Sequence, residues 1–375
     1  MTLRALFVFG TRPEAIKMAP LVHECQRRAG EIQALVCLTG QHREMLRQVT
    51  SYFEIAADVD LDLMRPDQTL PQLTARCIEA LDEVMATQSP DCVVVQGDTT
   101  TVLAASLAAF YRRLPVVHVE AGLRTGNLYA PWPEEMNRRV ASIMTALHCA
   151  PTAQSADNLL REGYPPATVH VTGNTVIDAL LWTVQRERAR HAHWQQPHAW
   201  IEDRRMVLIT GHRRESFGEP FRQICRAINQ LAQRFPDVAF LYPVHLNPNV
   251  QAPVRQLLGD TPNVRLVPPV PYPEFVWLMD RCTVLLSDSG GVQEEAPSLR
   301  KPLLVMRETT ERPEAVEAGA VELVGTDADR IVARATALLQ DSEEYARHQI
   351  SANPYGDGHA AKRIVDLMLQ QGWQS

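Results

Sequence analysis

The sequence has few cysteines, and none of them forms a recognisable motif. Its seven cysteines are scattered singly without a CxxC pair, which excludes a zinc knuckle and a dithiol redox motif. Cys37, Cys92, Cys149 and Cys282 lie within apolar runs, as small core residues do. This usage predicts free thiols and a reducing, cytoplasmic location.

The sequence also lacks an excess of basic residues and a long apolar run. Its 375 residues carry a net charge of -7, which argues against nucleic acid as the main partner. No apolar stretch is long enough to cross a bilayer, and the short apolar run before Gly10 is wrongly flanked for a signal peptide. We therefore expect neither nucleic acid nor a membrane among its partners.

Two cofactor signatures are missing as well. No GxGxxG turn follows the first apolar run, so a bound nicotinamide cofactor is not indicated. The candidate acids are not in DxD spacing and the histidines are not in HExxH spacing, so a metal is not indicated. The sequence predicts a reaction that uses no cofactor.

Short apolar runs alternate with helical segments along the whole chain. Leu3–Phe9 and Asp91–Gln96 read as buried strands in the first half, and Met206–Ile209 and Thr283–Ser287 in the second. This alternation predicts an α/β fold with a doubly wound parallel sheet in each half. The expected divisions are an N-terminal domain at 1–172, a crossover at 173–205, a C-terminal domain at 206–357 and a terminal helix at 358–375 that packs towards the N-terminal domain.

The segment LLSDSGGVQEE at 285–295 reads as a strand, a glycine turn and the start of a helix. Free backbone N–H groups and the helix dipole favour an anion there, and Gly290 and Gly291 let a phosphate approach the backbone. Glu295 lies about one turn further on, where a carboxylate can take two ribose hydroxyls. The alternative is an ordinary strand-to-helix turn with Asp288 or Ser289 as its N-cap.

A second strand–turn–helix unit near the N-terminus carries cations. Arg12 lies at the turn after Leu3–Phe9, and Lys17 lies one helical turn on. Cations oppose the dipole at a helix start, so we expect an anion to join them.

Acids follow two predicted strands of the first half, and another stands where a helix can begin. Asp98 and Glu120 sit at predicted strand carboxyl ends, where doubly wound sheets bind ligands, and Glu134 follows in a proline-rich stretch. These acids predict proton transfer in the first half, and the glycine turn predicts nucleotide binding in the second.

Seven segments, in order and in both halves, resemble the non-hydrolysing UDP-N-acetylglucosamine 2-epimerases. They are GTRPEAIKMAP at 10–20, GDTTT at 97–101, HVEAGLRT at 118–125, PWPEEMNRR at 131–139, GHRRESFG at 211–218, SDSGGVQEEAPSL at 287–299 and TTERPEAVEAG at 309–319. The resemblance implies a GT-B-like fold, two Rossmann-like domains with a cleft between them. It implies interconversion of UDP-N-acetylglucosamine and UDP-N-acetylmannosamine without metal or nicotinamide, in a homodimer.

The resemblance also assigns roles to residues. Asp98, Glu120 and Glu134 become the acid/base set that serves the two faces of the sugar C2. His212, Arg12 and Lys17 engage the diphosphate or assist its departure. The remaining substrate contacts implied by the resemblance are Ser289, Gly290 and Gly291 at phosphate, Glu295 at ribose, Arg312 at the substrate end, and Arg138 and Phe275.

Some positions depart from the family pattern. Arg300 stands in SLRKP where the family usually has glycine, so we expect no left-handed glycine cap at that helix end. Gln41 and His42 match part of a regulatory UDP-N-acetylglucosamine site of many members. Asp67 stands where a basic residue is often found, and its charge would repel a diphosphate, which argues against allosteric activation.

Three rival functions stay open at this point. They are a hydrolysing epimerase that releases N-acetylmannosamine and UDP, a GT-B glycosyltransferase, and a catalytically inactive nucleotide-sugar sensor. The acids of the first half favour epimerisation over sugar transfer, and the presence of Asp98, Glu120 and Glu134 argues against the sensor.

Overall fold

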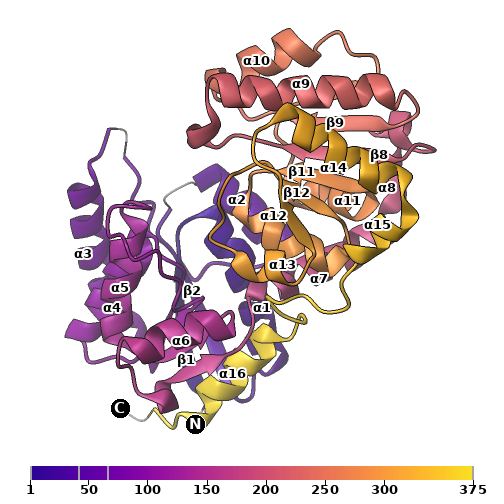
Figure 1. Ribbon diagram of the computed structural model, residues 1–375. Helices are drawn as coiled ribbons and strands as arrows, with labels where there is room; N and C mark the ends of the chain where they lie inside the picture. Colours follow the sequence, from indigo (N-terminus) through magenta and orange to yellow (C-terminus); the bar gives the residue numbers. More distant parts are fainter. Residues whose placement is uncertain (1, 41–42, 66, 374–375) are drawn as a thin grey trace. The chain divides into compact units, whose positions relative to one another are not determined.

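The chain divides into two compact units, each with its own parallel sheet (Figure 1). The computed structural model describes residues 2–40, 43–65 and 67–373. One unit comprises Met1–Ala179 and Gly356–Ser375, and the other comprises Leu180–Tyr355. The boundary falls inside helix α7 (Thr175–Ala189), which lies in the expected crossover at 173–205.

The first unit contains a seven-stranded sheet in the order β3-β2-β1-β4-β5-β6-β7, and all its described strand pairs are parallel. The strands are β1 (Leu3–Phe9), β2 (Ile32–Leu38), β3 (Val59–Asp60), β4 (Cys92–Gln96), β5 (Val116–Val119), β6 (Thr145–Ala150) and β7 (Val169–Val171). Its helices are α1 (Arg12–Arg27), α2 (Arg43–Tyr52), α3 (Leu70–Gln88), α4 (Thr100–Tyr111), α5 (Glu134–Met144), α6 (Ala153–Arg161), the 3-10 turn η1 (Pro166–Thr168) and α16 (Ala360–Gln370).

Helices α3, α4 and α5 cover one face of this sheet (Figure 1). Alternate residues of β1, such as Leu6 and Val8, join their core, while Phe7 and Phe9 are buried on the opposite side. Burial on both faces explains why β1 reads as a continuous apolar run instead of an alternating one.

The second unit repeats the architecture with six parallel strands in the order β10-β9-β8-β11-β12-β13. The strands are β8 (Met206–Thr210), β9 (Ala239–Pro243), β10 (Val264–Val267), β11 (Val284–Ser287), β12 (Leu303–Val305) and β13 (Val321–Leu323). Its helices are α8 (His191–Gln195), α9 (Glu219–Arg234), α10 (Pro248–Leu258), α11 (Tyr272–Arg281), α12 (Gly290–Glu295), α13 (Pro313–Glu317), α14 (Ala328–Gln340) and α15 (Ser342–Arg347), with 3-10 turns η2 (Ala199–Ile201), η3 (Arg214–Ser216) and η4 (Ala296–Leu299).

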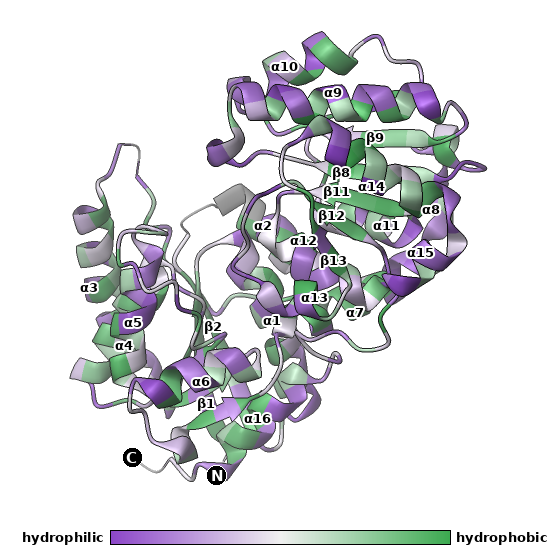
Figure 2. Ribbon diagram, in the orientation of Figure 1, coloured by the Kyte–Doolittle hydropathy of each residue, from purple (hydrophilic) through white to green (hydrophobic). Residues whose placement is uncertain are grey.

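The core of the second unit lies between this sheet and helices α9, α10 and α14. Figure 2 shows the apolar strands β9 and β11 in green within the sheet. The expected fold class, two Rossmann-like doubly wound sheets of the GT-B type in one α/β chain, is therefore confirmed.

One local expectation was wrong. Although Arg300 replaces the usual glycine, it ends η4 in the left-handed conformation, with φ 54° and ψ 38°. Its backbone N–H donates to the carbonyls of Ala296 and Pro297. The cap therefore persists on a side chain that favours other conformations, because these backbone bonds hold it there.

Candidate active site

In both units the candidate residues follow the strands between which the strand order reverses. β1 and β4 are neighbours in the first sheet, and the segments after them carry Arg12 and Asp98. β8 and β11 are neighbours in the second, and the segments after them carry His212 and Ser289. Doubly wound sheets bind ligands at such points, so each unit presents a candidate ligand site of its own.

The Glu120 carboxylate lies in a dense network of donors. Lys17 Nζ contacts both of its oxygens, at 2.6 and 2.7 Å, and the Asn174 amide donates to Oε1 at 3.2 Å. The Gln96 amide donates to Oε2. Glu120 follows β5 with a positive φ of 64°, a conformation that costs energy for a non-glycine residue. The backbone and the donors together fix this carboxylate in one orientation.

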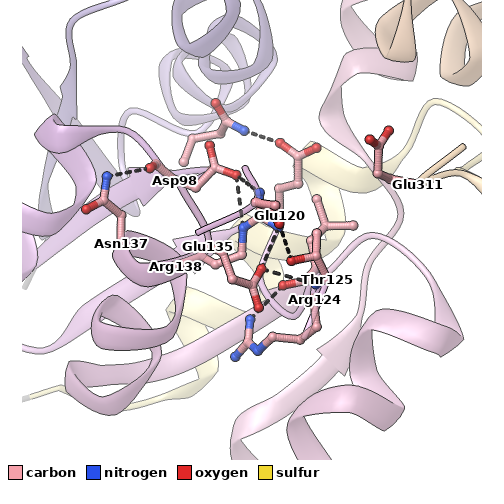
Figure 3. Close-up of polar contacts among 12 residues, drawn as sticks. Asp98, Glu120, Arg124, Thr125, Glu135, Asn137, Arg138 and Glu311 are labelled. Atoms are coloured by element: carbon pink, nitrogen blue, oxygen red, sulfur yellow. Dashed lines mark hydrogen bonds and ion pairs between the residues drawn. The ribbon is translucent and has the colours of Figure 1, made fainter. Parts of the chain in front are cut away.

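Asp98 and Glu135 share the guanidinium of Arg138 (Figure 3). Arg138 Nε donates to Asp98 Oδ2 at 3.0 Å, Nη2 donates to the same oxygen, and Nη1 donates to Glu135 Oε2 at 3.1 Å. Asn137 donates to the Asp98 backbone carbonyl at 2.9 Å. Helix α5 therefore holds the strand-end acid through two consecutive residues, and the sequence did not reveal Glu135 as the second acid on Arg138.

Glu134 and Arg12 occupy the first positions of helices α5 and α1. Both side chains are half-buried. Within the part of the chain that the structure describes, neither has an ion-pair or hydrogen-bonding partner. Both charges are therefore available to a ligand.

Glu14 is a buried acid that sequence reasoning missed. Its Oε2 accepts from the backbone N–H groups of Gly10 and Thr11 at 3.0 and 2.7 Å, and its Oε1 accepts from the Thr99 hydroxyl at 2.6 Å. Burial raises the pKa of this carboxyl against the lowering effect of these hydrogen bonds. Glu14 thus ties the turn that carries Arg12 to the turn that follows Asp98.

The glycine turn of the second unit has the predicted strand–turn–helix form. Ser289 is the N-cap of α12, although its side chain makes no capping bond, and Gly290 and Gly291 are the first residues of the helix. A Cβ on Gly290 would lie 3.2 Å from the Arg312 guanidinium carbon. Arg312 Nε also donates to Glu294 at 2.9 Å, so the glycine and an ion pair together place a cation over the turn.

Glu295 on α12 and Phe275 on α11 are the two further residues that the sequence predicts to contact the substrate. Glu295 is buried and accepts from the Tyr272 hydroxyl at 3.2 Å. Phe275 lies in the first turn of α11 and is half-buried. The Glu295 carboxylate is thereby held by α11, the helix that also carries Phe275.

His212 follows β8, with about 42% of its side chain exposed. Desolvation lowers its pKa, as do the nearby His245 and Arg213, whereas the Asp288 charge opposes this shift. Asp288 is fully buried and accepts from the backbone N–H groups of His212 and Arg213 at 2.7 and 2.8 Å. The residue that the sequence suggested as an N-cap therefore holds the His212 loop instead.

The structure thus joins Asp98 to Arg138, Glu120 to Lys17, and Gly290 to Arg312. Among the described residues, no group of three or more His, Cys, Asp and Glu side chains is placed to hold a metal ion. All seven cysteines are free and buried, as the apolar surroundings of four of them predicted.

Two remaining features concern the rest of the chain. Gln41 and His42 lie outside the described residues, and Asp67 adopts a positive φ of 54°. Across the described residues, no helix is both long and apolar enough to span a membrane.

Comparison with known proteins gives a consistent match over both units. The sequence model of the family described as UDP-N-acetylglucosamine 2-epimerase matches residues 23–369. The UDP-N-acetylglucosamine 2-epimerase of Escherichia coli K12 is 53% identical over 370 residues, which cover 98% of each chain.

Solved structures agree with the sequence relatives. The crystal structure of UDP-GlcNAc 2-epimerase from Neisseria meningitidis bound to UDP-GlcNAc is 50% identical, with a TM-score of 0.91 over 98% of this chain and 100% of that one. The Methanocaldococcus jannaschii UDP-GlcNAc 2-epimerase in complex with UDP-GlcNAc and UDP is 30% identical, with a TM-score of 0.80 over 98% and 99%. The chain therefore belongs to the UDP-N-acetylglucosamine 2-epimerase family.

Proposed function

We propose that this protein interconverts UDP-N-acetylglucosamine and UDP-N-acetylmannosamine without hydrolysing either. UDP is eliminated to give a glycal and is then re-added, with the C2 proton delivered to the opposite face. Asp98 and Glu120, two carboxylates at strand ends of the first sheet, are the observation that carries this proposal, because Arg138 and Lys17 hold them in defined orientations. Family membership supplies the substrate class.

The chemistry asks for several acids and a held leaving group. As the C1–O bond breaks, its electron pair leaves with UDP and C1 gains positive character, which makes the C2 proton acidic. A carboxylate removes that proton, the C2–H electrons form the C1=C2 bond, and neighbouring carboxylates stabilise the positive ring. Re-addition reverses these steps with the proton on the other face, so that no oxidant or reductant is consumed.

The geometry of the first unit supports different tasks for the three acids. Glu120 already accepts from Lys17, Gln96 and Asn174, so it suits electrostatic stabilisation of the ring. Asp98 keeps about 25% of its side chain exposed, and Glu134 is half-buried at the start of α5, so both suit proton transfer. Residues 1–172 form the acid/base domain in this proposal.

The second unit supplies the UDP site, within residues 206–357. The N–H groups of Gly290 and Gly291 at the start of α12, the Ser289 hydroxyl and the Arg312 guanidinium meet the needs of a diphosphate. Glu295 takes the ribose hydroxyls, and Phe275 on the neighbouring α11 contacts the nucleotide. His212, together with Arg12 and Lys17 of the first unit, assists the departure of the diphosphate.

The test is proton NMR of the purified protein with UDP-N-acetylglucosamine in D₂O, without added metal or NAD. We expect a manno anomeric signal that is still coupled to phosphorus, together with deuterium at C2. Free N-acetylmannosamine and UDP would move the protein to the hydrolysing class. Retained C2 protons with an unchanged spectrum would contradict the proposal.

The same assay assigns the acids. Asp98→Asn and Glu134→Gln should each slow C2 exchange by roughly 10²–10⁴-fold, the usual contribution of one acid/base group. Arg112→Ala, which removes an exposed cation paired with Asp82, is the control and should exchange like the wild type. If the three single variants Asp98→Asn, Glu120→Gln and Glu134→Gln all kept full activity, these acids would have no role in the mechanism.

A further inference from the structure

Asp288, at the carboxyl end of β11, has one satisfied and one unsatisfied carboxylate oxygen. Its Oδ2 accepts from two backbone N–H groups, those of His212 at 2.7 Å and Arg213 at 2.8 Å. Its Oδ1 is buried and has no hydrogen-bond partner within the described residues. A buried carboxylate oxygen without a donor is costly, so its position calls for an explanation.

The imidazole of His212 is a candidate donor to this oxygen. Nδ1 of His212 lies 3.6 Å from Asp288 Oδ1, within ion-pair range but longer than a hydrogen bond. Catalytic hydrogen bonds are often this long before a substrate binds, and they shorten in the bound state. A small rotation of the half-exposed ring would close this gap, because the His212 backbone is already fixed to the same carboxylate.

Further contacts fix the surroundings of the His212 ring and the backbone of the residue before it. The His245 ring stacks on His212 with centroids 5.2 Å apart and an interplanar angle of 13°. The Tyr242 hydroxyl donates to the Gly211 carbonyl at 2.9 Å, and a Cβ on Gly211 would lie 3.1 Å from that hydroxyl. The His212 ring thus lies between the stacked His245 ring and Asp288, with Nδ1 on the side of Oδ1.

We propose that Asp288 is the positioning residue of His212, holding the proton of the neutral ring on Nδ1 and stabilising the imidazolium when Nε2 is protonated. The hydrogen bond on one ring nitrogen decides which tautomer the ring adopts, so the carboxylate leaves Nε2 free to gain or donate a proton. The expected effect on catalysis rests on the role proposed above for His212 at the leaving diphosphate. The positioning of the His212 ring by Asp288 does not depend on that role.

The charges around the ring decide the direction of the effect. His245 after β9 and Arg213 after β8 disfavour the imidazolium, and Asp288 after β11 favours it. Removing the Asp288 charge should therefore lower the pKa of His212 further. The protonated ring, which can donate to a phosphate oxygen, would then persist only at lower pH.

The test uses the full-length protein labelled with ¹⁵N and long-range ¹H–¹⁵N spectra, with the His212 signals assigned from a His212→Gln sample. In the wild type we expect the proton of the neutral ring on Nδ1. In Asp288→Asn the side-chain oxygen still accepts from the backbone, and its NH₂ group faces Nδ1, so the proton should move to Nε2 and the titration midpoint should fall. Turnover of UDP-N-acetylglucosamine should drop at least about tenfold in kcat with a smaller change in KM.

A matched control separates positioning from the general loss of a buried carboxylate. Asp178 also accepts from two backbone N–H groups, those of Ala360 and Ala361, but it belongs to the first unit and lies outside the proposed site. Asp178→Asn should leave the His212 tautomer, its titration and kcat as in the wild type.

Each outcome decides the proposal. A wild-type ring with its proton on Nε2 overturns it without any variant, even if Asp288→Asn fails to fold. A tautomer change in Asp288→Asn with unchanged kcat overturns the catalytic half. If the wild type proves to have no epimerase activity, the NMR result still decides whether Asp288 positions His212, so the two failures remain distinguishable.

Discussion

Lys17 and Glu120 are a nearly buried ion pair, with 14% and 6% of their side chains exposed. Removing one partner leaves the other charge nearly buried and without its counter-ion, which costs roughly 3–5 kcal/mol. We therefore expect Lys17→Met to lower the free energy of unfolding by that amount. The double variant Lys17→Met/Glu120→Gln should lose less than the sum of the two single variants. Urea unfolding of the four proteins measures the coupling.

The exposed pair between Arg112 and Asp82 serves as the comparison. Both side chains are in contact with water, which screens their attraction, so Arg112→Ala should leave the urea midpoint unchanged. Strictly additive losses at Lys17 and Glu120 would show that this ion pair contributes nothing to stability.

At the scale of single residues, the sequence predicts positions better than partners. Asp98 and Glu120 could be placed because the carboxyl ends of parallel strands meet at one edge of a sheet. The long-range contacts of Glu14 and Asp288 could not, because the donors Thr99 and His212 lie 85 and 76 residues away in the sequence. An isolated Asp or Glu in a turn looks the same whether it caps its own helix or holds a distant loop.

Helices α7 and α16 are joined by Asp178, which accepts from the first two N–H groups of α16 at 3.2 and 2.9 Å. Burial raises the pKa of Asp178 to about 6 from the usual 3.8, against the lowering effect of these bonds. A raised folded-state pKa gives stability that is present below pH 3.8 and lost as the pH rises through about 6. The wild type should therefore lose about 2 kcal/mol through this group between about pH 4 and pH 7.

Asp178→Asn removes that dependence. The free energy of unfolding of the variant minus that of the wild type should rise by about 2 kcal/mol over the same pH range. Asp357→Asn is the control, because the Arg363 guanidinium lowers the pKa of Asp357 to about 2. The free energy of unfolding of that variant should differ from that of the wild type by an almost constant amount between about pH 4 and pH 7. If the Asp178→Asn and wild-type stability curves were parallel over this range, the assignment of the raised pKa to Asp178 would be wrong.

At the scale of elements, long buried strands were the most predictable. Leu3–Phe9 has the bounds expected from its apolar run, and β4 at Cys92–Gln96 begins one residue after the expected Asp91–Gln96. β3 was missed because it has only two residues, Val59 and Asp60, and neither is buried. The cap at Arg300 was mispredicted because backbone hydrogen bonds outweigh the preference of a single side chain.

The two units have separate cores, and α16 belongs to the first although it follows the second in sequence. Ile364 of α16 is fully buried, so Ile364→Ala should cost roughly 2–5 kcal/mol. Hydrogen exchange should then accelerate in β1–β7 and their helices, and not in α14 of the second unit. Mass spectrometry of deuterated peptides reads both.

Leu338→Ala in α14 is the matched control, because Leu338 is equally well buried in the core of the second unit. It should accelerate exchange in β8–β13 and spare β1–β7. If Ile364→Ala acted mainly on the second unit, the assignment of α16 to the first would be wrong.

The order in which the chain is made follows from this division. The chain leaves the first unit after Ala179 and returns to it at Gly356. A ribosome therefore joins every residue of the second unit to the chain before it makes α16. Until then the first unit lacks α16, whose Ile364 and Met368 are buried in the folded protein and whose Asp366 pairs with Arg28. The unit whose synthesis begins first is thus the last to have its complete set of contacts.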